Sequence, residues 1–391
     1  MLLLSDFDLA AFSVLCLVYR AEPSYFVVIK GEDTMQKKLS FFLVFVLLFA
    51  CLMTACGPKD QELDTESFSD ETFRYVSYDD GWGIAAVEGL AQPVVEIPAT
   101  VKERPVVRIE QNGFANNTGI TTLTVPGTVK EIGISAFSGC TALATITMPE
   151  SVELIGSEAF ANTAFYNDAA NWADDSLYLG KYLIKVKTSI GAEYDVKSGT
   201  LAIASHAFAD RDDYFGYIGC AALKEVTFPS SLKAIGDGAF KNCKALETFD
   251  IPASVTYIGD YAFHNTAYVN QELNKKTDNP EEILDVLYIG KHLIQVNEEK
   301  LGESYTVASG TVAINAPAFA DCEELTTVEI PGSVKRIGVA AFRNCTALTS
   351  IVFDGTEEEW NAISKGYDWD KNTGAYQITF KKVAPPETTE K

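Results

Sequence analysis

The sequence predicts a repeat solenoid, rich in β-strands and connected by short turns or helical segments, with a period of roughly 23 residues. The first observation is a series of eight phenylalanines, in which four of the seven intervals are 23 residues long. An Ile-Gly pair precedes five of them at a fixed distance, and five cysteines occupy one fixed place in the repeat. Such spacing indicates a unit that stacks on copies of itself, because one unit cannot bury its own apolar side. The phenylalanines are Phe114, Phe137, Phe160, Phe208, Phe240, Phe263, Phe319 and Phe342.

Each unit is expected to form one coil of the solenoid. In the unit that begins at Leu223, a short strand over 223–228 directs its Leu, Val and Phe side chains toward the core. Pro229 then ends the strand ladder, because proline has no N–H to donate. The Ile-Gly pair supplies one inward side chain and a glycine free to turn, and the following Ala-Phe inserts a ring into the opposite wall.

At the amino end, residues 35–55 have the features of a bacterial lipoprotein signal peptide. A positively charged start at Met35 is followed by an apolar run over 39–52, and small residues directly precede Cys56. This arrangement resembles a lipobox, in which the cysteine thiol receives a diacylglycerol. We therefore expect lipid attachment at Cys56 and a location on the outer face of the bacterial cell membrane. An uncleaved transmembrane helix is the alternative, but the run is shorter than the roughly 20 residues that a span needs.

The remaining terminal segments follow from composition. Residues 1–34 precede a complete signal peptide and are predicted to be a mis-assigned upstream segment, with translation starting at Met35. Residues 56–70, rich in Asp, Glu, Ser and Lys, are predicted to be a flexible tether. We expect an amino-terminal cap over 71–93 and a carboxy-terminal cap and tail over 354–391.

The repeats are expected over 94–353, interrupted by two related inserts near 164–199 and 267–310. Each insert carries almost the same ten residues, LYLGKYLIKV in the first and LYIGKHLIQV in the second. Both are predicted to bear strands and to rejoin the solenoid at Ile203 and Ile314. Inserts on one face of a solenoid often border its binding surface.

The combined motif resembles the BspA-like, or Treponema pallidum-type, leucine-rich repeat family, whose unit reads approximately L-x-x-I-x-I-P-x-x-V-x-x-I-G-x-x-A-F-x-x-C. The resemblance covers about residues 94–353 and implies a leucine-rich-repeat-like solenoid. The sequence departs from the motif at Ala204 and Asn315, which stand where Gly is usual and put the turn geometry there in doubt. The resemblance also implies a surface-exposed bacterial protein, with some relatives acting as adhesins for host matrix proteins or other bacteria.

Five cysteines follow the export segment, all at the same place in the repeat. An odd number argues against a complete disulfide framework. No CxxC motif or histidine cluster accompanies them, so no metal site is predicted. Because free cysteine behaves as a small buried hydrophobe, we expect a stacked column inside the solenoid. The cysteines are Cys140, Cys220, Cys243, Cys322 and Cys345.

No catalytic motif is present, so the protein is not expected to be an enzyme or to need a cofactor. The three histidines, His206, His264 and His292, lie at variable or aromatic repeat positions without metal-binding spacing, and we expect structural or solvated roles. Residues 368–374 resemble a calcium loop, but the glycine comes one position late and a Thr stands where a bidentate Glu is needed. We predict a turn there, before a final strand over 376–380.

The net charge of −23 disfavours nucleic acid and anionic membrane surfaces as partners, because their phosphates would be repelled. Cationic and neutral partners remain open. On the predicted strands, polar residues alternate with the inward apolar ones and form an outward row rich in threonine. A threonine ladder also favours strand packing by itself, which is the alternative to binding. The candidate binding face comprises Thr124, Thr147, Glu225, Thr227, Thr248, Asp250, Thr327 and Glu329, with Trp172, Tyr178 and Tyr182 of the first insert.

These observations favour a lipid-anchored cell-surface protein that binds a host or bacterial protein or mediates adhesion. The alternatives are an envelope scaffold that associates with itself and a surface protein that binds glycans through the aromatic residues of the inserts.

Overall fold

The computed structural model describes residues 67–212, 216–273, 286–298 and 300–382, all within one compact unit, Thr65–Lys391. The predicted lipid site at Cys56, the signal peptide and the upstream segment lie outside the described residues. None of the described helices is long and apolar enough to cross a membrane.

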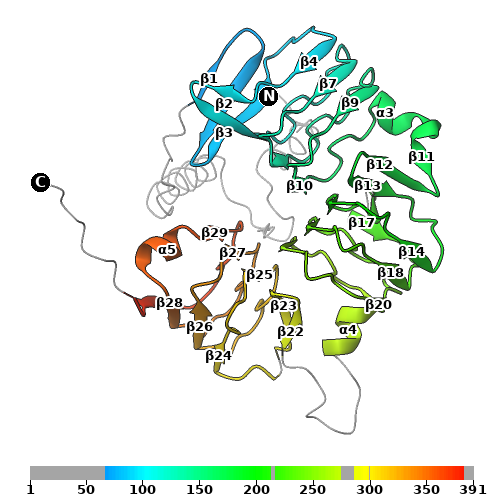
Figure 1. The fold of residues 1–391 in the computed structure, drawn as a ribbon. Coiled ribbons are helices and arrows are strands. Elements are labelled where there is room, and N and C mark those ends of the chain that lie inside the picture. The colour runs from blue at the N-terminus through cyan, green and yellow to red at the C-terminus, as the bar shows by residue number, and fades with distance from the viewer. Residues whose placement is uncertain (1–66, 213–215, 274–285, 299, 383–391) are drawn as a thin grey trace, which may run out of the picture. The chain divides into compact units, whose positions relative to one another are not determined.

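Three antiparallel strands form the amino-terminal cap: β1 (Ser67–Ser69), β2 (Phe73–Tyr78) and β3 (Gly81–Ala86) (Figure 1). The cap is joined to the solenoid because β3 pairs in parallel with β6 (Arg104–Ile109). Phe68 of β1 stacks on the buried Tyr75 ring at a centroid distance of 4.7 Å. The predicted tether over 56–70 is therefore wrong for its last residues, which form a paired strand.

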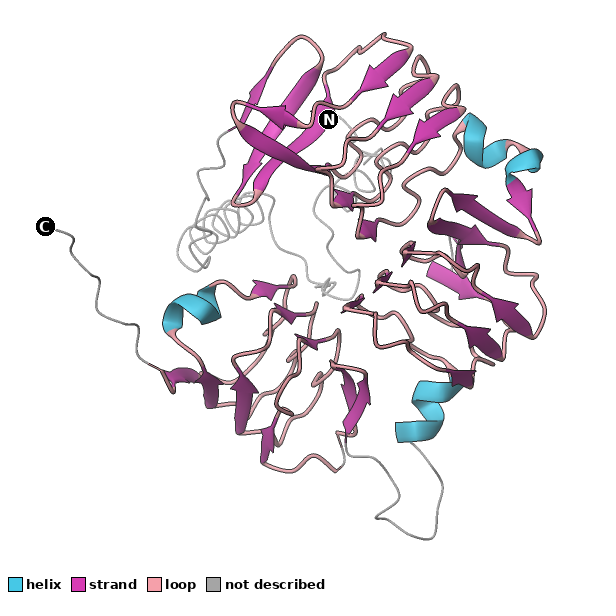
Figure 2. Ribbon diagram, viewed as in Figure 1, coloured by secondary structure: helices cyan, strands magenta, loops and turns pink. Residues whose placement is uncertain are grey.

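Each coil contributes two short strands, one just before the repeat proline and one at the Ile-Gly pair (Figure 2). We call them proline-side and glycine-side strands. The proline-side strands are β4 (Val94–Glu96), β7 (Thr122–Thr124), β9 (Thr145–Thr147), β14 (Glu193–Asp195), β18 (Glu225–Thr227), β20 (Thr248–Phe249), β24 (Ser304–Thr306), β26 (Thr327–Pro331), β28 (Ser350–Asp354) and β30 (Gln377–Phe380). The glycine-side strands are β6, β8 (Glu131–Ile132), β10 (Leu154–Ile155), β13 (Tyr182–Val186), β15 (Ala202–Ile203), β19 (Ala234–Ile235), β21 (Tyr257–Ile258), β23 (His292–Val296), β25 (Ala313–Ile314), β27 (Arg336–Ile337) and β29 (Ser364–Lys365). A further short strand, β5 (Thr100–Val101), pairs with β6.

The described solenoid is divided into three blocks. Its proline-side strands form three separate parallel sheets, β4-β7-β9, β14-β18-β20 and β24-β26-β28-β30. The glycine-side strands are divided in the same way, into sheets that contain β6-β8-β10, β13-β15-β19-β21 and β23-β25-β27-β29. The core divides into three clusters of buried side chains. The predicted repeat fold is confirmed, and the two inserts separate the blocks.

The two inserts have the same local structure. The first contains α3 (Ala164–Asn167), the 3-10 helix η2 (Ala169–Asn171), β11 (Trp172–Ala173) and the hairpin β12 (Ser176–Leu179) to β13. The second contains α4 (Ala267–Leu273) and the hairpin β22 (Val286–Ile289) to β23. Both hairpins have a register shift at the same place, and both second strands pair in parallel with the strand that holds Ile203 or Ile314. The predicted duplication and its rejoining points are confirmed.

Threonine replaces the repeat cysteine where each insert begins. The buried hydroxyl groups of Thr163 and Thr266 donate to the carbonyl oxygens of Phe160 and Phe263, at 2.8 and 2.9 Å. Each hydroxyl also accepts an N–H of the helix that follows, from Tyr166 or Val269. A cysteine would cap the helix less well, because sulfur is a weak acceptor.

Aromatic rings and thiols fill the core as predicted. All eight repeat phenylalanines are buried, and the rings of neighbouring coils in a block stack at centroid distances of 4.4 to 5.6 Å. The five repeat cysteines are buried and free, which confirms the predicted column. Burial raises the pKa of Cys140 to about 11 and that of Cys322 and Cys345 to about 12.

The glycine of the Ile-Gly pair begins a turn, as predicted: the carbonyl oxygen of Gly156 accepts the N–H of Ala159 at 3.3 Å. The structure shows a second requirement for glycine at this position. A Cβ at Gly156 would lie 2.4 Å from the backbone nitrogen of Ile134 in the preceding coil. A Cβ at Gly236 would likewise lie 2.5 Å from the backbone nitrogen of Ser205. The glycine is therefore needed because the backbones of successive coils approach closely here.

The departures from glycine fit this explanation. Glu110, Ala204 and Asn315 stand at this repeat position, and each belongs to the first coil of its block that follows the repeat motif. The strands that pair before these coils, β3, β13 and β23, belong to the cap or to an insert hairpin. A first coil has no regular coil before it, so a side chain can be accommodated.

At the carboxy-terminal end, α5 (Glu357–Asn361) begins with a capping box between Thr356 and Glu359. Trp360 of this helix is buried against Phe353. The last described strand, β30, covers Gln377–Phe380 and confirms the strand expected over 376–380.

Candidate functional site

The outward row of the proline-side strands is solvent-accessible. Its members alternate with buried residues: Val226 of β18, for example, is 1% exposed between two exposed neighbours. Of the predicted residues on this row, Thr147, Glu225, Thr227, Thr248 and Asp250 are exposed, and Thr124, Thr327 and Glu329 are half-buried.

The structure distributes these residues over three sheets. Thr124 and Thr147 are register partners in the first block, and Glu225 and Thr248 are partners in the second. In the third block, Glu329 forms an ion pair with Lys381 at 2.8 Å. The row is therefore not one continuous ladder but three local surfaces.

The second block carries most of the negative charge of the outward row. Four of its six outward positions hold exposed carboxylates, Glu193, Asp195, Glu225 and Asp250, which we call the acidic face. The corresponding positions of the first block hold one carboxylate, Glu96. Within the described part of the chain, no ion pair is recorded for the acidic face.

Strand stability does not explain the acidic face. Glu193 and Glu225 lie directly opposite each other in the register of β14 and β18. Like charges in directly opposite positions destabilise a strand pair. A cationic partner would offset this repulsion. The pairing of Glu193 with Glu225 was not predictable from the sequence, because it depends on the strand register.

The predicted aromatic residues of the first insert have different environments. Trp172 is half-buried and donates its indole N–H to the Tyr166 carbonyl at 2.8 Å. The half-buried Tyr178 hydroxyl lies 3.2 Å from that of Tyr194. Tyr182 is 1% exposed, and its hydroxyl donates to the Pro149 carbonyl at 2.6 Å. The prediction of Tyr182 as a binding residue is wrong, because its ring belongs to the core between the first two blocks.

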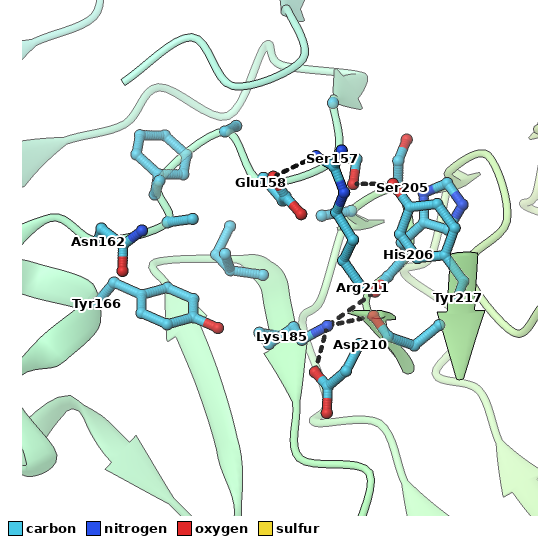
Figure 3. Close-up of a pocket in the computed structure, with 17 residues that line it drawn as sticks. Ser157, Glu158, Asn162, Tyr166, Lys185, Ser205, His206, Asp210, Arg211 and Tyr217 are labelled. Atoms are coloured by element: carbon cyan, nitrogen blue, oxygen red, sulfur yellow. Dashed lines mark hydrogen bonds and ion pairs between the residues drawn. The ribbon is translucent and has the colours of Figure 1, made fainter. Parts of the chain in front are cut away.

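A pocket of about 220 Å³ lies beside the first insert (Figure 3). One wall is a hairpin, β16 (Ala209–Asp212) and β17 (Gly216–Gly219), that interrupts the coil between Phe208 and Cys220. This hairpin was not predicted from the sequence. The interval from Phe208 to Phe240 is 32 residues instead of 23, and this extra length was the signal for it.

Polar contacts hold the hairpin against neighbouring coils. Lys185 of β13 forms an ion pair with Asp210 at 3.0 Å, and Arg211 forms one with Glu158 at 3.7 Å (Figure 3). The Tyr217 hydroxyl lies 3.3 Å from the Ser157 hydroxyl. These contacts bring together side chains from the first block, the insert and the second block.

His206 and Tyr217 form the adjacent wall. Their rings stack with centroids 3.6 Å apart. Burial, aided by the positive charges of Lys241 and Lys185, lowers the pKa of His206 to about 4, so the ring is neutral at pH 7. Burial also lowers the pKa of His264 and lowers that of His292 to about 4.

No metal centre is formed by the described residues, among which no group of three or more His, Cys, Asp or Glu side chains could hold an ion. The calcium-like segment over 368–374 is a turn whose carboxylates have protein partners. Lys371 pairs with Asp368 at 2.7 Å, and the Tyr376 hydroxyl donates to Asp370 at 2.6 Å.

The chain matches the model of one protein family. The family described as the BspA type leucine rich repeat region matches residues 107–214, 212–283 and 298–365, in six copies. No curated protein matches the chain.

Several solved structures are similar to the chain. The Treponema pallidum leucine rich repeat protein is 20% identical, with 72% of this chain and 91% of that chain covered and a TM-score of 0.26. A leucine rich cell surface protein of Faecalibacterium prausnitzii is 21% identical, with coverages of 79% and 98% and a TM-score of 0.24. A leucine-rich repeat protein of Bacteroides ovatus is 22% identical, with coverages of 80% and 90% and a TM-score of 0.27.

Proposed function

The chain belongs to the BspA-type leucine-rich repeat family, and from this premise we propose that it is a surface-displayed scaffold that binds a basic protein partner through its acidic face. Repeat scaffolds of this kind offer an extended surface on which neighbouring coils present equivalent positions.

The observation that supports this function is the concentration of carboxylates on one sheet. Glu193, Asp195, Glu225 and Asp250 are exposed on adjacent strands of the second block. A clustered negative surface accelerates the encounter with a positively charged partner and selects against acidic ones. The partner should therefore present Lys or Arg to this face, and its binding should weaken as salt screens the charges.

The test is capture by the full chain at low and high salt, compared with a charge-reversed variant. Glu225→Lys with Asp250→Lys should abolish capture of the partner. The control is Thr124→Lys with Thr147→Lys, which adds two positive charges to outward positions of the first block and should leave capture intact. A partner that is retained by the reversed acidic face would contradict the proposal.

We propose further that Cys56 anchors the protein to the membrane through a lipid. The support is the lipobox-like sequence, with small residues before the cysteine and an apolar run before them. Cys56→Ala should release or mislocalise the protein, whereas Cys51→Ala should not. Retention of the Cys56 variant on the membrane would refute the anchor while leaving the protein-binding proposal intact.

A further inference from the structure

The pocket beside the first insert lies where the coil-to-coil hydrogen-bond ladder is interrupted. In the first block, the N–H of Phe114 donates to Ala136 of the next coil at 2.7 Å, and that of Phe137 donates to Ala159 at 2.8 Å. The equivalent donor is Phe160, flanked by Glu158 and Asn162. No acceptor among the described residues is recorded for these three backbone N–H groups. Their residues line the pocket, so the end of the ladder supplies hydrogen-bond donors to it.

The side chains around the pocket supply both donors and acceptors. Lys185 and Arg211 carry positive charge, and Glu158 and Asp210 carry negative charge. The charges of these four groups cancel, so the pocket favours neither an anion nor a cation. A neutral ligand rich in hydroxyl groups can donate to the carboxylates and accept from the N–H groups at the same time.

The volume of the pocket and its aromatic lining further restrict the class of ligand. About 220 Å³ is less than the roughly 300–1,000 Å³ of pockets for drug-sized molecules, and it suits a single ring. Tyr166 lies on the side of the pocket opposite the hairpin (Figure 3), with its ring edge-to-face with Trp172 at 5.4 Å. The half-buried Tyr166 ring offers an apolar surface on which the C–H face of a sugar ring can pack. Hydrogen bonds to the hydroxyl groups would leave that face without a contact.

We propose that this pocket binds one neutral sugar unit, with Glu158 and Asp210 accepting from its hydroxyl groups and Tyr166 packing on its ring. The sugar is either free or the terminal unit of a glycan. This inference does not depend on the protein-binding proposal, because the acidic face lies on other strands.

The second insert provides an internal control, since the duplication gives two of the charged pocket residues a counterpart. Lys185 corresponds to Gln295, and Asp210 corresponds to Asp321. Cys322 follows Asp321 directly, so the wall-forming hairpin is absent from that coil. Asp210 and Asp321 are both 49% exposed and each pairs with a cation. Comparing the Asp210→Ala and Asp321→Ala variants separates the loss of a pocket acceptor from the general effect of removing a paired aspartate.

The experiment is saturation-transfer NMR on the full chain with neutral hexoses, N-acetylhexosamines and their oligosaccharides, each at about 10 mM, where a site with a Kd of ~1 mM is nearly saturated. We expect transfer from at least one sugar. Asp210→Ala should weaken its binding about tenfold or more, since it removes a charged acceptor, and Asp321→Ala should not. Glu158→Gln is a second pocket variant, and circular dichroism checks that every variant is folded.

The outcomes are distinct. Equal affinity for a monosaccharide and its oligosaccharides assigns a free sugar, and tighter binding of the oligosaccharide assigns a terminal glycan unit. The proposal is overturned if no neutral sugar gives transfer, if only anionic sugars bind, or if folded Asp210→Ala and Glu158→Gln variants bind as the unmodified chain does.

Discussion

Arg336 and Asp260 form a largely buried ion pair that joins the second and third blocks. Their side chains are 18% and 14% exposed. Asp260 follows β21 in the second block, and Arg336 lies on β27 in the third. The same carboxylate accepts the backbone N–H of Val339 at 3.0 Å, and Arg336 donates a second bond to the Ile258 carbonyl at 2.7 Å.

Asp260→Ala should therefore destabilise the protein strongly. It leaves the largely buried Arg336 guanidinium without its ion-pair partner, and breaking a buried pair costs up to about 3–5 kcal/mol. Urea unfolding followed by tryptophan fluorescence measures the effect. Lys371→Ala is the control, because it removes an exposed pair with Asp368 that is worth about 0–1 kcal/mol. Similar losses in both variants would show that the buried pair has no special role.

The five repeat thiols should resist alkylation in the native protein. Thiolate is the reactive form, and burial raises the pKa of Cys345, for example, to about 12. We expect iodoacetamide at pH 8 to leave Cys140, Cys220, Cys243, Cys322 and Cys345 unmodified until denaturant is added, as read by mass spectrometry. Rapid labelling of any of them under native conditions would contradict the placement of the column in the core.

Sequence periodicity was sufficient to predict the coils because each coil repeats the same physical requirement. Phe137 and Phe160, for example, are 23 residues apart and stack at 5.6 Å. The role of Gly156 was not predictable in this way, because glycine is compatible with a turn and with close approach alike. Only the position of the Ile134 backbone shows that close approach requires glycine here.

The candidate sites were less accessible to sequence analysis. Single outward residues such as Glu225 were identified, but their grouping depends on where the inserts divide the row into separate sheets. The pocket depends on contacts between distant segments, such as Arg211 with Glu158 and Tyr217 with Ser157. Repeat spacing carries no information about the direction in which an inserted hairpin folds.

Gly156→Ala should destabilise the first block, because the added methyl group would collide with the Ile134 backbone nitrogen at 2.4 Å. Overpacking of this kind costs about 1–3 kcal/mol. Gly191→Ala is the matched control, since no atom lies within 4 Å of a Cβ at that glycine. Thermal unfolding of the two variants decides the question, and an unchanged melting temperature for Gly156→Ala would count against close approach as the reason for the glycine.

Acid should destabilise the protein through its buried histidines. His292 is 3% exposed, and burial, with a contribution from the Arg336 charge, lowers its pKa from 6.5 to about 4. Between these values the unfolded chain binds a proton that the folded chain does not, so stability is complete above pH 6.5 and is lost as the pH falls toward 4. At about 1.4 kcal/mol per pKa unit, this residue accounts for roughly 3 kcal/mol over that range. In His292→Tyr, which takes the residue of the equivalent position Tyr182, urea unfolding from pH 7 to 4 should show a smaller loss of stability. An unchanged pH dependence would mean that His292 becomes protonated without unfolding.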